Sequence, residues 1–87
     1  MRLDKYLKVS RIIKRRTVAK EACDGGRVTI NGRVAKPSSE IKVGDVITIA
    51  FGHREIKVLV KEVRDSASKQ QAFEMYEVLE EKKEELV

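Results

Sequence analysis

The chain has 87 residues and a net charge of +5, with 41% apolar and 38% charged residues. This length allows one small domain and excludes an enzyme with a cleft between two lobes. The apolar share is enough for a core and excludes global disorder. Aromatic residues make up only 5%, and Trp is absent. This argues against single-strand recognition on an extended platform of stacked rings, which needs several exposed aromatic side chains.

Cysteine and membrane signals are sparse. Cys23 is the only cysteine and His53 the only histidine. A disulfide needs a second cysteine and a zinc site needs several ligands, so we expect no disulfide, no metal and no cofactor. The most apolar run, residues 46–51, suits a strand and is too short to cross a bilayer. Without disulfides or a signal-peptide pattern, we expect a cytoplasmic protein with no membrane contact.

The charge is unevenly distributed along the chain. Residues 1–36 hold eleven Lys and Arg against three Asp and Glu, which gives +8. Residues 37–64 carry +1, and residues 65–87 carry −4. The concentrated positive charge predicts a polyanionic partner, either nucleic acid or an anionic membrane face.

Two short helices are predicted first. Over residues 3–9, apolar side chains recur at helical spacing, and Asp4 in the first turn either complements the helix dipole or holds a neighbouring Arg in place. Thr17 is a good N-cap and predicts the start of a second helix, which Gly25-Gly26 would end. Cys23 lies on the apolar stripe of this helix, so we interpret it as a small buried hydrophobe rather than a reactive thiol.

An antiparallel sheet is predicted next. Residues 27–30 alternate in polarity, and Asn31-Gly32 is a strong hairpin signal before a return strand over residues 33–36. Residues 46–51 form a further strand, and a last one ends near Val63 or Arg64. The simplest arrangement is a meander with a core on one face.

The C-terminal segment is predicted to be helical. Residues 65–68 resemble a linker, which divides the chain into a domain over 1–64 and a C-terminal helix and acidic tail over 65–87. Within residues 70–79 one helix face is apolar, comprising Ala72, Met75, Tyr76 and Leu79. This face either docks on the domain or contacts a partner protein. The charged end, residues 80–87, is expected to fray.

Catalytic motifs are missing, and a basic cluster is conspicuous. The sequence has no phosphate-binding glycine loop, and His53 falls at a predicted turn, so we expect no catalytic residues and no enzyme. Six cations fall within thirteen residues: Lys8, Arg11, Lys14, Arg15, Arg16 and Lys20. The densest part directly precedes Thr17, where a helix N-terminus and Arg side chains together favour phosphate.

The first 51 residues resemble the S4 RNA-binding domain. The motifs that carry the resemblance are Arg2-Leu3-Asp4-Lys5-Tyr6-Leu7, Ser10-Arg11, Lys14-x-Arg16-Thr17-x-Ala19, Gly26-Arg27-Val28-x-Ile30-Asn31-Gly32, Lys36-Pro37-Ser38 and Val43-Gly44-Asp45-Val46. Their joint spacing makes the match specific. The resemblance implies an α+β, S4-like (alpha-L) fold with two N-terminal helices, a small antiparallel sheet and a short C-terminal helix.

The resemblance also implies binding positions. Arg2, Arg11, Lys14 and Arg16 match basic positions of the family pattern, and Thr17 matches its small hydroxyl residue. Local charge adds a second group of candidates: Lys8, Arg15, Lys20, Arg27 and Lys36.

Among small stand-alone S4 proteins, the chain is most similar to the RqcP (YabO) family. This likeness implies binding of 23S rRNA near helix 69 and of peptidyl-tRNA on stalled 50S subunits. It further implies that the protein is associated with ribosomes and helps RqcH in alanine tailing of the nascent chain. We expect the protein to be a monomer.

Three alternatives remain open at this stage. The chain resembles heat-shock S4 proteins that recycle stalled 50S subunits, although those usually carry a basic C-terminal extension. It could instead be a protein-interaction adaptor acting through the C-terminal helix, or an accessory subunit that gives a separate enzyme affinity for RNA. DNA binding is disfavoured because no recognition helix with base-reading side chains is evident.

Overall fold

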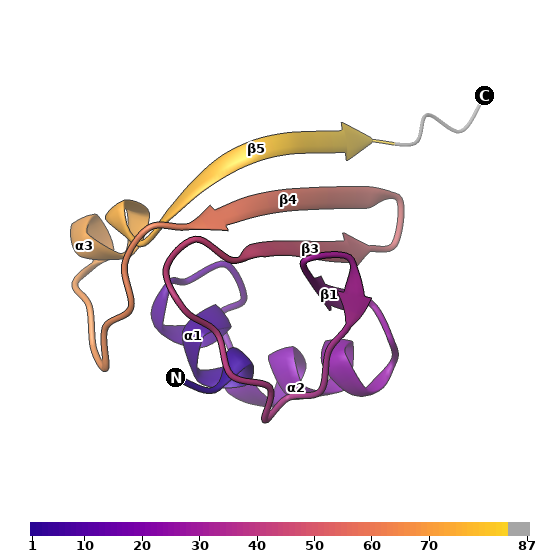
Figure 1. Cartoon of the computed structure of the whole chain (residues 1–87), viewed down its shortest axis with the longest axis horizontal. Helices are drawn as coiled ribbons and strands as arrows, with labels where there is room; N and C mark the ends of the chain where they lie inside the picture. The colour runs from indigo at the N-terminus through magenta and orange to yellow at the C-terminus, as the bar shows by residue number, and fades with distance from the viewer. Residues whose placement is uncertain (84–87) are drawn as a thin grey trace.

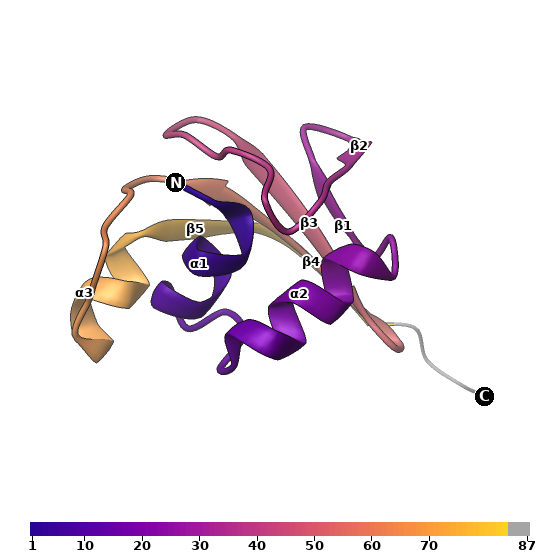
Figure 2. The same cartoon turned by 90° about the horizontal axis from the view of Figure 1, so that it is seen from below.

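The computed structural model describes residues 1–83, which form one five-stranded antiparallel sheet and three helices (Figures 1 and 2). The helices and strands are α1 (Leu3–Val9), α2 (Arg16–Asp24), β1 (Val28–Ile30), β2 (Arg33–Val34), β3 (Val46–Phe51), β4 (Arg54–Val60), α3 (Lys69–Glu74) and β5 (Tyr76–Lys83). The predicted α+β class is confirmed. Within the described residues, no helix has the length and apolar character needed to cross a membrane.

The two N-terminal helices lie where the sequence predicts them, but Thr17 is not the N-cap. Arg15 occupies that position, so Thr17 already lies in the first helical turn. The far end of α2 follows the Gly25-Gly26 prediction. Gly26 has a φ of 72°, and the Arg27 N–H donates to the carbonyl of Ala22 at 3.0 Å. This is the Schellman arrangement, which satisfies otherwise free helix carbonyls.

The sheet is not the predicted meander, because its strand order is β2-β1-β3-β4-β5. The Asn31-Gly32 turn joins β1 to β2 as predicted, and both turn residues have positive φ. The chain then leaves the sheet and crosses the start of α1, where the carbonyls of Pro37 and Ser39 accept the N–H groups of Asp4 and Leu3 at 3.1 and 2.8 Å. It re-enters on the free side of β1, so β3 pairs with β1 rather than with β2.

The C-terminal segment departs most from the prediction. The helix α3 ends at Glu74, and the following residues form β5, which pairs with β4 from Val60 opposite Tyr76 to Arg54 opposite Lys83. The strand β4 ends at Val60 rather than near Arg64. The predicted helix over residues 70–79 is therefore wrong in its second half, because the open edge of β4 offers backbone partners. The predicted fraying of residues 80–87 is wrong for 80–83, and the rest lies outside the described residues.

The core connects α1 to the sheet and to the junction of α3 and β5. Leu3, Tyr6 and Leu7 are fully buried together with strand residues and Met75. The Tyr6 hydroxyl donates to the carbonyl of Met75 at 2.7 Å, and burial beside Tyr76 raises its pKa, so it stays protonated. This contact holds the middle of α1 beside the end of α3.

Candidate nucleic-acid interface

Asp4 brings two of the predicted binding residues together. Its side chain is 5% exposed and accepts hydrogen bonds from Arg2 at 3.2 and 3.3 Å and from Arg16 at 3.4 Å. The backbone N–H of Lys5 donates to the same carboxylate at 2.8 Å. The expectation that Asp4 holds a neighbouring Arg is confirmed, and it holds two that are fourteen positions apart.

The charge state of Asp4 keeps this cluster in place. Burial raises the pKa of the carboxyl, but hydrogen bonds from Arg2, Arg16 and the Lys5 N–H, with the positive charge of Arg16, hold the pKa below its usual value. The carboxylate is therefore ionised at neutral pH. Both arginine side chains are about half exposed, and their hydrogen bonds to Asp4 leave most of their N–H donors available to an anion.

The start of α2 adds backbone donors beside this pair. Arg15 is the N-cap and its side chain makes no capping hydrogen bond, and the helical ladder begins with the Ala19 N–H donating to the Arg15 carbonyl at 3.0 Å. The N–H groups of the first turn thus point outward at the positive end of the helix dipole. Lys14, Arg15 and Thr17 are exposed at the same place. This combination is suited to phosphate.

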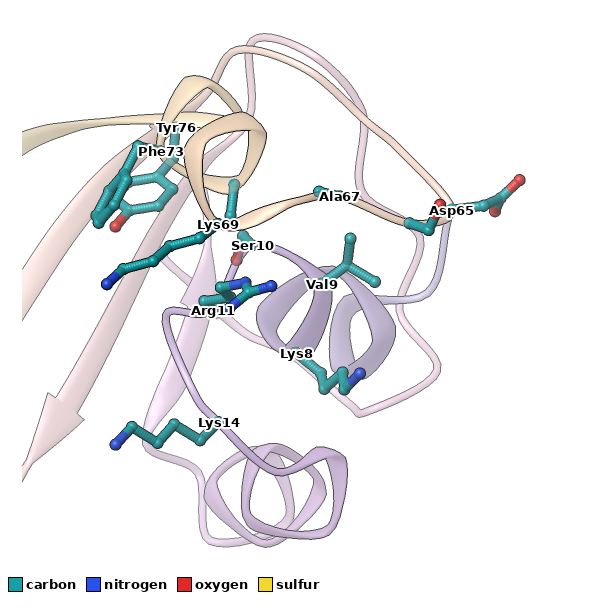
Figure 3. Close-up of a pocket in the computed structure, with 12 residues that line it drawn as sticks. Lys8, Val9, Ser10, Arg11, Lys14, Asp65, Ala67, Lys69, Phe73 and Tyr76 are labelled. Carbon is teal, nitrogen blue, oxygen red and sulfur yellow. The ribbon is translucent and has the colours of Figure 1, made fainter.

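Lys8, Arg11 and Lys14 line a groove of about 710 Å³ whose other wall comes from the C-terminal segment (Figure 3). That wall includes Lys69, Phe73 and Tyr76. Sequence reasoning missed these three residues because it assigned the segment to a docked helix. One signal in the sequence could have indicated them: Phe73 lies outside the apolar face predicted for that helix, so its ring is expected to be exposed.

Arg11 has an unusual backbone conformation. It follows Ser10, the C-cap of α1, with a φ of 62°, and its N–H donates to the Lys8 carbonyl at 3.0 Å. Glycine usually fills this left-handed position after a helix, because a side chain there is sterically unfavourable. A strained arginine at the edge of a groove is typical of a residue retained for its side chain.

The remaining candidates are more scattered. Lys20 is exposed on α2, and Arg27 lies beyond the far end of that helix, about 13 Å of helix rise from Arg16. Lys36 is exposed in the loop that covers the start of α1. The structure therefore groups Arg2 with Arg16, and Lys8 with Arg11 and Lys14, whereas Arg27 lies apart. Their role in binding stays a prediction.

The structure also places two other residues that the sequence singles out, Cys23 and His53. Cys23 is 3% exposed, and burial, with the negative charges of Asp4 and Asp24, raises its pKa to about 11. The thiol is therefore protonated at neutral pH, which confirms the interpretation as a buried hydrophobe. His53 is exposed in the turn between β3 and β4. In the part of the chain that the structure describes, no three His, Cys, Asp or Glu side chains are grouped to hold a metal ion.

Comparison with known proteins identifies the family. Residues 1–47 match the S4 domain model, which is more than half of the chain. The chain belongs to the S4 domain family. It is also 54% identical over 83 residues to the RQC P-site tRNA stabilizing factor of Bacillus subtilis, covering 95% of this chain and 96% of that protein. The protein of the same name from Streptococcus pneumoniae is 57% identical over 81 residues, with 93% and 92% covered.

Among solved structures, Heat Shock Protein 15 of Vibrio cholerae is similar with a TM-score of 0.83 and 34% identity, covering 90% of this chain and 80% of that one. The two proteins share the S4 fold. The higher identity to the stabilizing factors places the chain in their family, which is the RqcP family that its sequence resembles.

Proposed function

We propose that this protein binds RNA on the large ribosomal subunit and stabilises P-site tRNA during ribosome-associated quality control. The observation that carries the proposal is the pair of Arg2 and Arg16, fixed by buried Asp4 beside the uncapped start of α2. The names of relatives with 54% and 57% identity support the P-site tRNA as ligand. The protein acts as a binding factor, without catalysis of its own.

In the finer form of the proposal, the basic surface contacts 23S rRNA near helix 69 and also peptidyl-tRNA on stalled 50S subunits. By holding that tRNA, it assists RqcH in alanine tailing. Positioned Arg side chains and helix N–H groups recognise phosphates in a defined arrangement and not base sequence, which suits a folded RNA surface. We further propose that the protein acts as a monomer, with residues 1–64 as the RNA-binding domain and 65–87 as its C-terminal extension.

The test compares Arg16→Ala with Lys61→Ala, which removes an exposed cation just after β4. Both side chains lie outside the core, so both variants should fold. Losing a positioned charge-assisted contact costs about 1.5–3 kcal/mol, so Arg16→Ala should reduce association with large subunits about tenfold or more. Sedimentation of each variant with purified large subunits measures the effect. Equal sedimentation of the two variants would contradict the proposed interface.

A further inference from the structure

The groove between α1 and α3 combines cations with an exposed aromatic ring. Its volume is about 710 Å³, within the usual range for small-molecule sites. Figure 3 shows Phe73 and Tyr76 near α3, with Arg11 and Lys14 on the side of α1 and α2. Phe73 is 63% exposed, and it is the only aromatic side chain exposed among residues 1–83.

Local structure fixes the outward direction of Phe73. A capping box begins α3, with the Gln71 N–H donating to the Ser68 hydroxyl at 3.2 Å and the Ser68 N–H donating to the Gln71 side chain at 3.0 Å. On this helix Ala72 and Met75 are 1% and 0% exposed. The helical turn between them directs Phe73 away from the core. The ring is thus held on a short, well-capped helix without a core partner of its own.

The cations of the groove are available to a ligand. Lys8, Arg11, Lys14 and Lys69 form no ion pair within residues 1–83. Among residues 1–83 the one carboxylate in the lining is Asp65, which lies at the end opposite the rings (Figure 3) and is paired with Lys5 at 3.0 Å. The ring end of the groove therefore has an excess of positive charge.

We propose that this groove binds one unpaired nucleotide of RNA, with the base stacked on Phe73 and the flanking phosphates held by the four cations. The proposal deepens the RNA-binding function proposed above and rests on it. Low aromatic content excludes an extended stacking platform, but a single site needs one ring. A base with its adjoining phosphates matches both features of the groove, since every base has a face for stacking and every linkage carries a negative charge.

The absence of Trp from the sequence provides a direct test. In Phe73→Trp the new indole is the only one, so its fluorescence reports on stacking. A short oligouridylate should quench this fluorescence, and a ribose-phosphate chain of the same length without bases should not. The matched control is Val43→Trp, at a site 60% exposed and outside the groove, whose fluorescence should not respond to either chain. Unchanged fluorescence in Phe73→Trp, or equal quenching by both chains, would overturn the proposal.

A second variant guards against disturbance by the larger indole. Phe73→Leu keeps apolar bulk and removes the aromatic face. Stacking on a protein ring contributes enough per base that affinity for oligouridylate should fall about fivefold to a hundredfold. Affinity for the base-free chain should stay unchanged. Equal affinity of Phe73→Leu and the parent for oligouridylate would overturn the groove assignment.

The two proposals can fail separately. If Phe73→Leu retains its affinity while Arg16→Ala loses large subunits, the groove proposal fails and the proposed function stands. If Arg16→Ala sediments like the parent while oligouridylate quenches Phe73→Trp, the groove binds RNA but the ribosomal interface is misplaced.

Discussion

At the scale of single residues, Asp4 acts as the organiser of the basic surface. Among residues 1–83 it is the one carboxylate that contacts both Arg2 and Arg16, so in the proposed interface a negative charge would support binding of a negative ligand. Its lowered pKa means that its stabilising contribution is fully present above the unfolded value, near pH 4. The contribution is lost only as the pH falls through the lower folded pKa. The cluster is therefore intact at neutral pH.

The Asp4→Asn variant shows whether RNA affinity depends more on the positions of Arg2 and Arg16 or on the net charge of the protein. The variant loses one negative charge, so its net charge becomes more positive by one. Simple electrostatics therefore predicts tighter RNA binding. We expect several-fold weaker binding, because Arg2 and Arg16 lose their common anchor. Asp24→Asn makes the same charge change at an exposed site on α2 and is the matched control. Titration of both variants with ribosomal RNA measures the difference, and tighter binding by Asp4→Asn than by Asp24→Asn would refute the anchoring role.

Arg11 allows binding and stability to be separated. Its positive φ of 62° costs an ordinary residue about 1–2 kcal/mol, whereas glycine adopts it freely. Arg11→Gly should therefore keep or slightly raise the melting temperature and lower RNA affinity about tenfold through loss of a charged contact. Arg11→Lys keeps the charge and the strain, and should retain most of the affinity. Undiminished RNA binding by Arg11→Gly would show that the arginine is not needed.

At the scale of elements, local signals predict local structure well. The helix over residues 3–9, the Gly25-Gly26 stop and the Asn31-Gly32 hairpin are each specified by neighbours in sequence. The strand β5 is not specified in this way, because Tyr76 and Leu79 are three positions apart, a spacing that predicts one face of a helix rather than one face of a strand. Its partner β4 decides the outcome, and no local pattern shows that β4 has an open edge.

The same limit applies to the candidate interface. The basic residues around α2 stand out in the sequence because they are contiguous. The groove wall formed by Lys69, Phe73 and Tyr76 depends on the hydrogen bond between the Tyr6 hydroxyl and the Met75 carbonyl, across 69 positions. Such a contact follows from the tertiary fold, so the sequence alone could not predict the groove.

The strand β5 should contribute measurably to stability. Truncation after Leu79 removes four residues that pair with β4, including Glu80 and Glu81. If the segment were a frayed tail, the truncation would be neutral. We expect a melting temperature lower by several degrees, since about 1 kcal/mol shifts a domain of this size by about 4–8 °C. The double substitution Glu80→Gln and Glu81→Gln keeps the strand and should have a smaller effect, because exposed ion pairs contribute little.

At the scale of the whole molecule, opposite charges lie on different parts of the fold. The basic residues gather around α1 and α2, on one face of the sheet, whereas Glu80 and Glu81 lie on the edge strand β5 (Figures 1 and 2). There they pair with Lys57 and Arg54 of β4. Neighbouring cations thus reduce the repulsion that these carboxylates exert on RNA, and screening limits its range to about 8 Å in physiological salt. We infer that the part of β5 that carries Glu80 and Glu81 faces away from the bound RNA, whereas Tyr76 at the start of the strand lines the groove.

This charge separation predicts a strong dependence of RNA affinity on salt. If the basic surface neutralises about five to eight phosphates, log K should fall with log salt with a slope of roughly −3 to −7. Lys14→Gln, which removes one of the proposed phosphate contacts, should make the slope less steep by about one. The double substitution Glu80→Gln and Glu81→Gln should leave the slope unchanged, because those side chains lie away from the RNA. Titrations of ribosomal RNA across a series of salt concentrations measure all three slopes. A slope near zero for the parent would contradict the basic surface as the binding site, and a changed slope in the glutamate variant would place Glu80 or Glu81 within it.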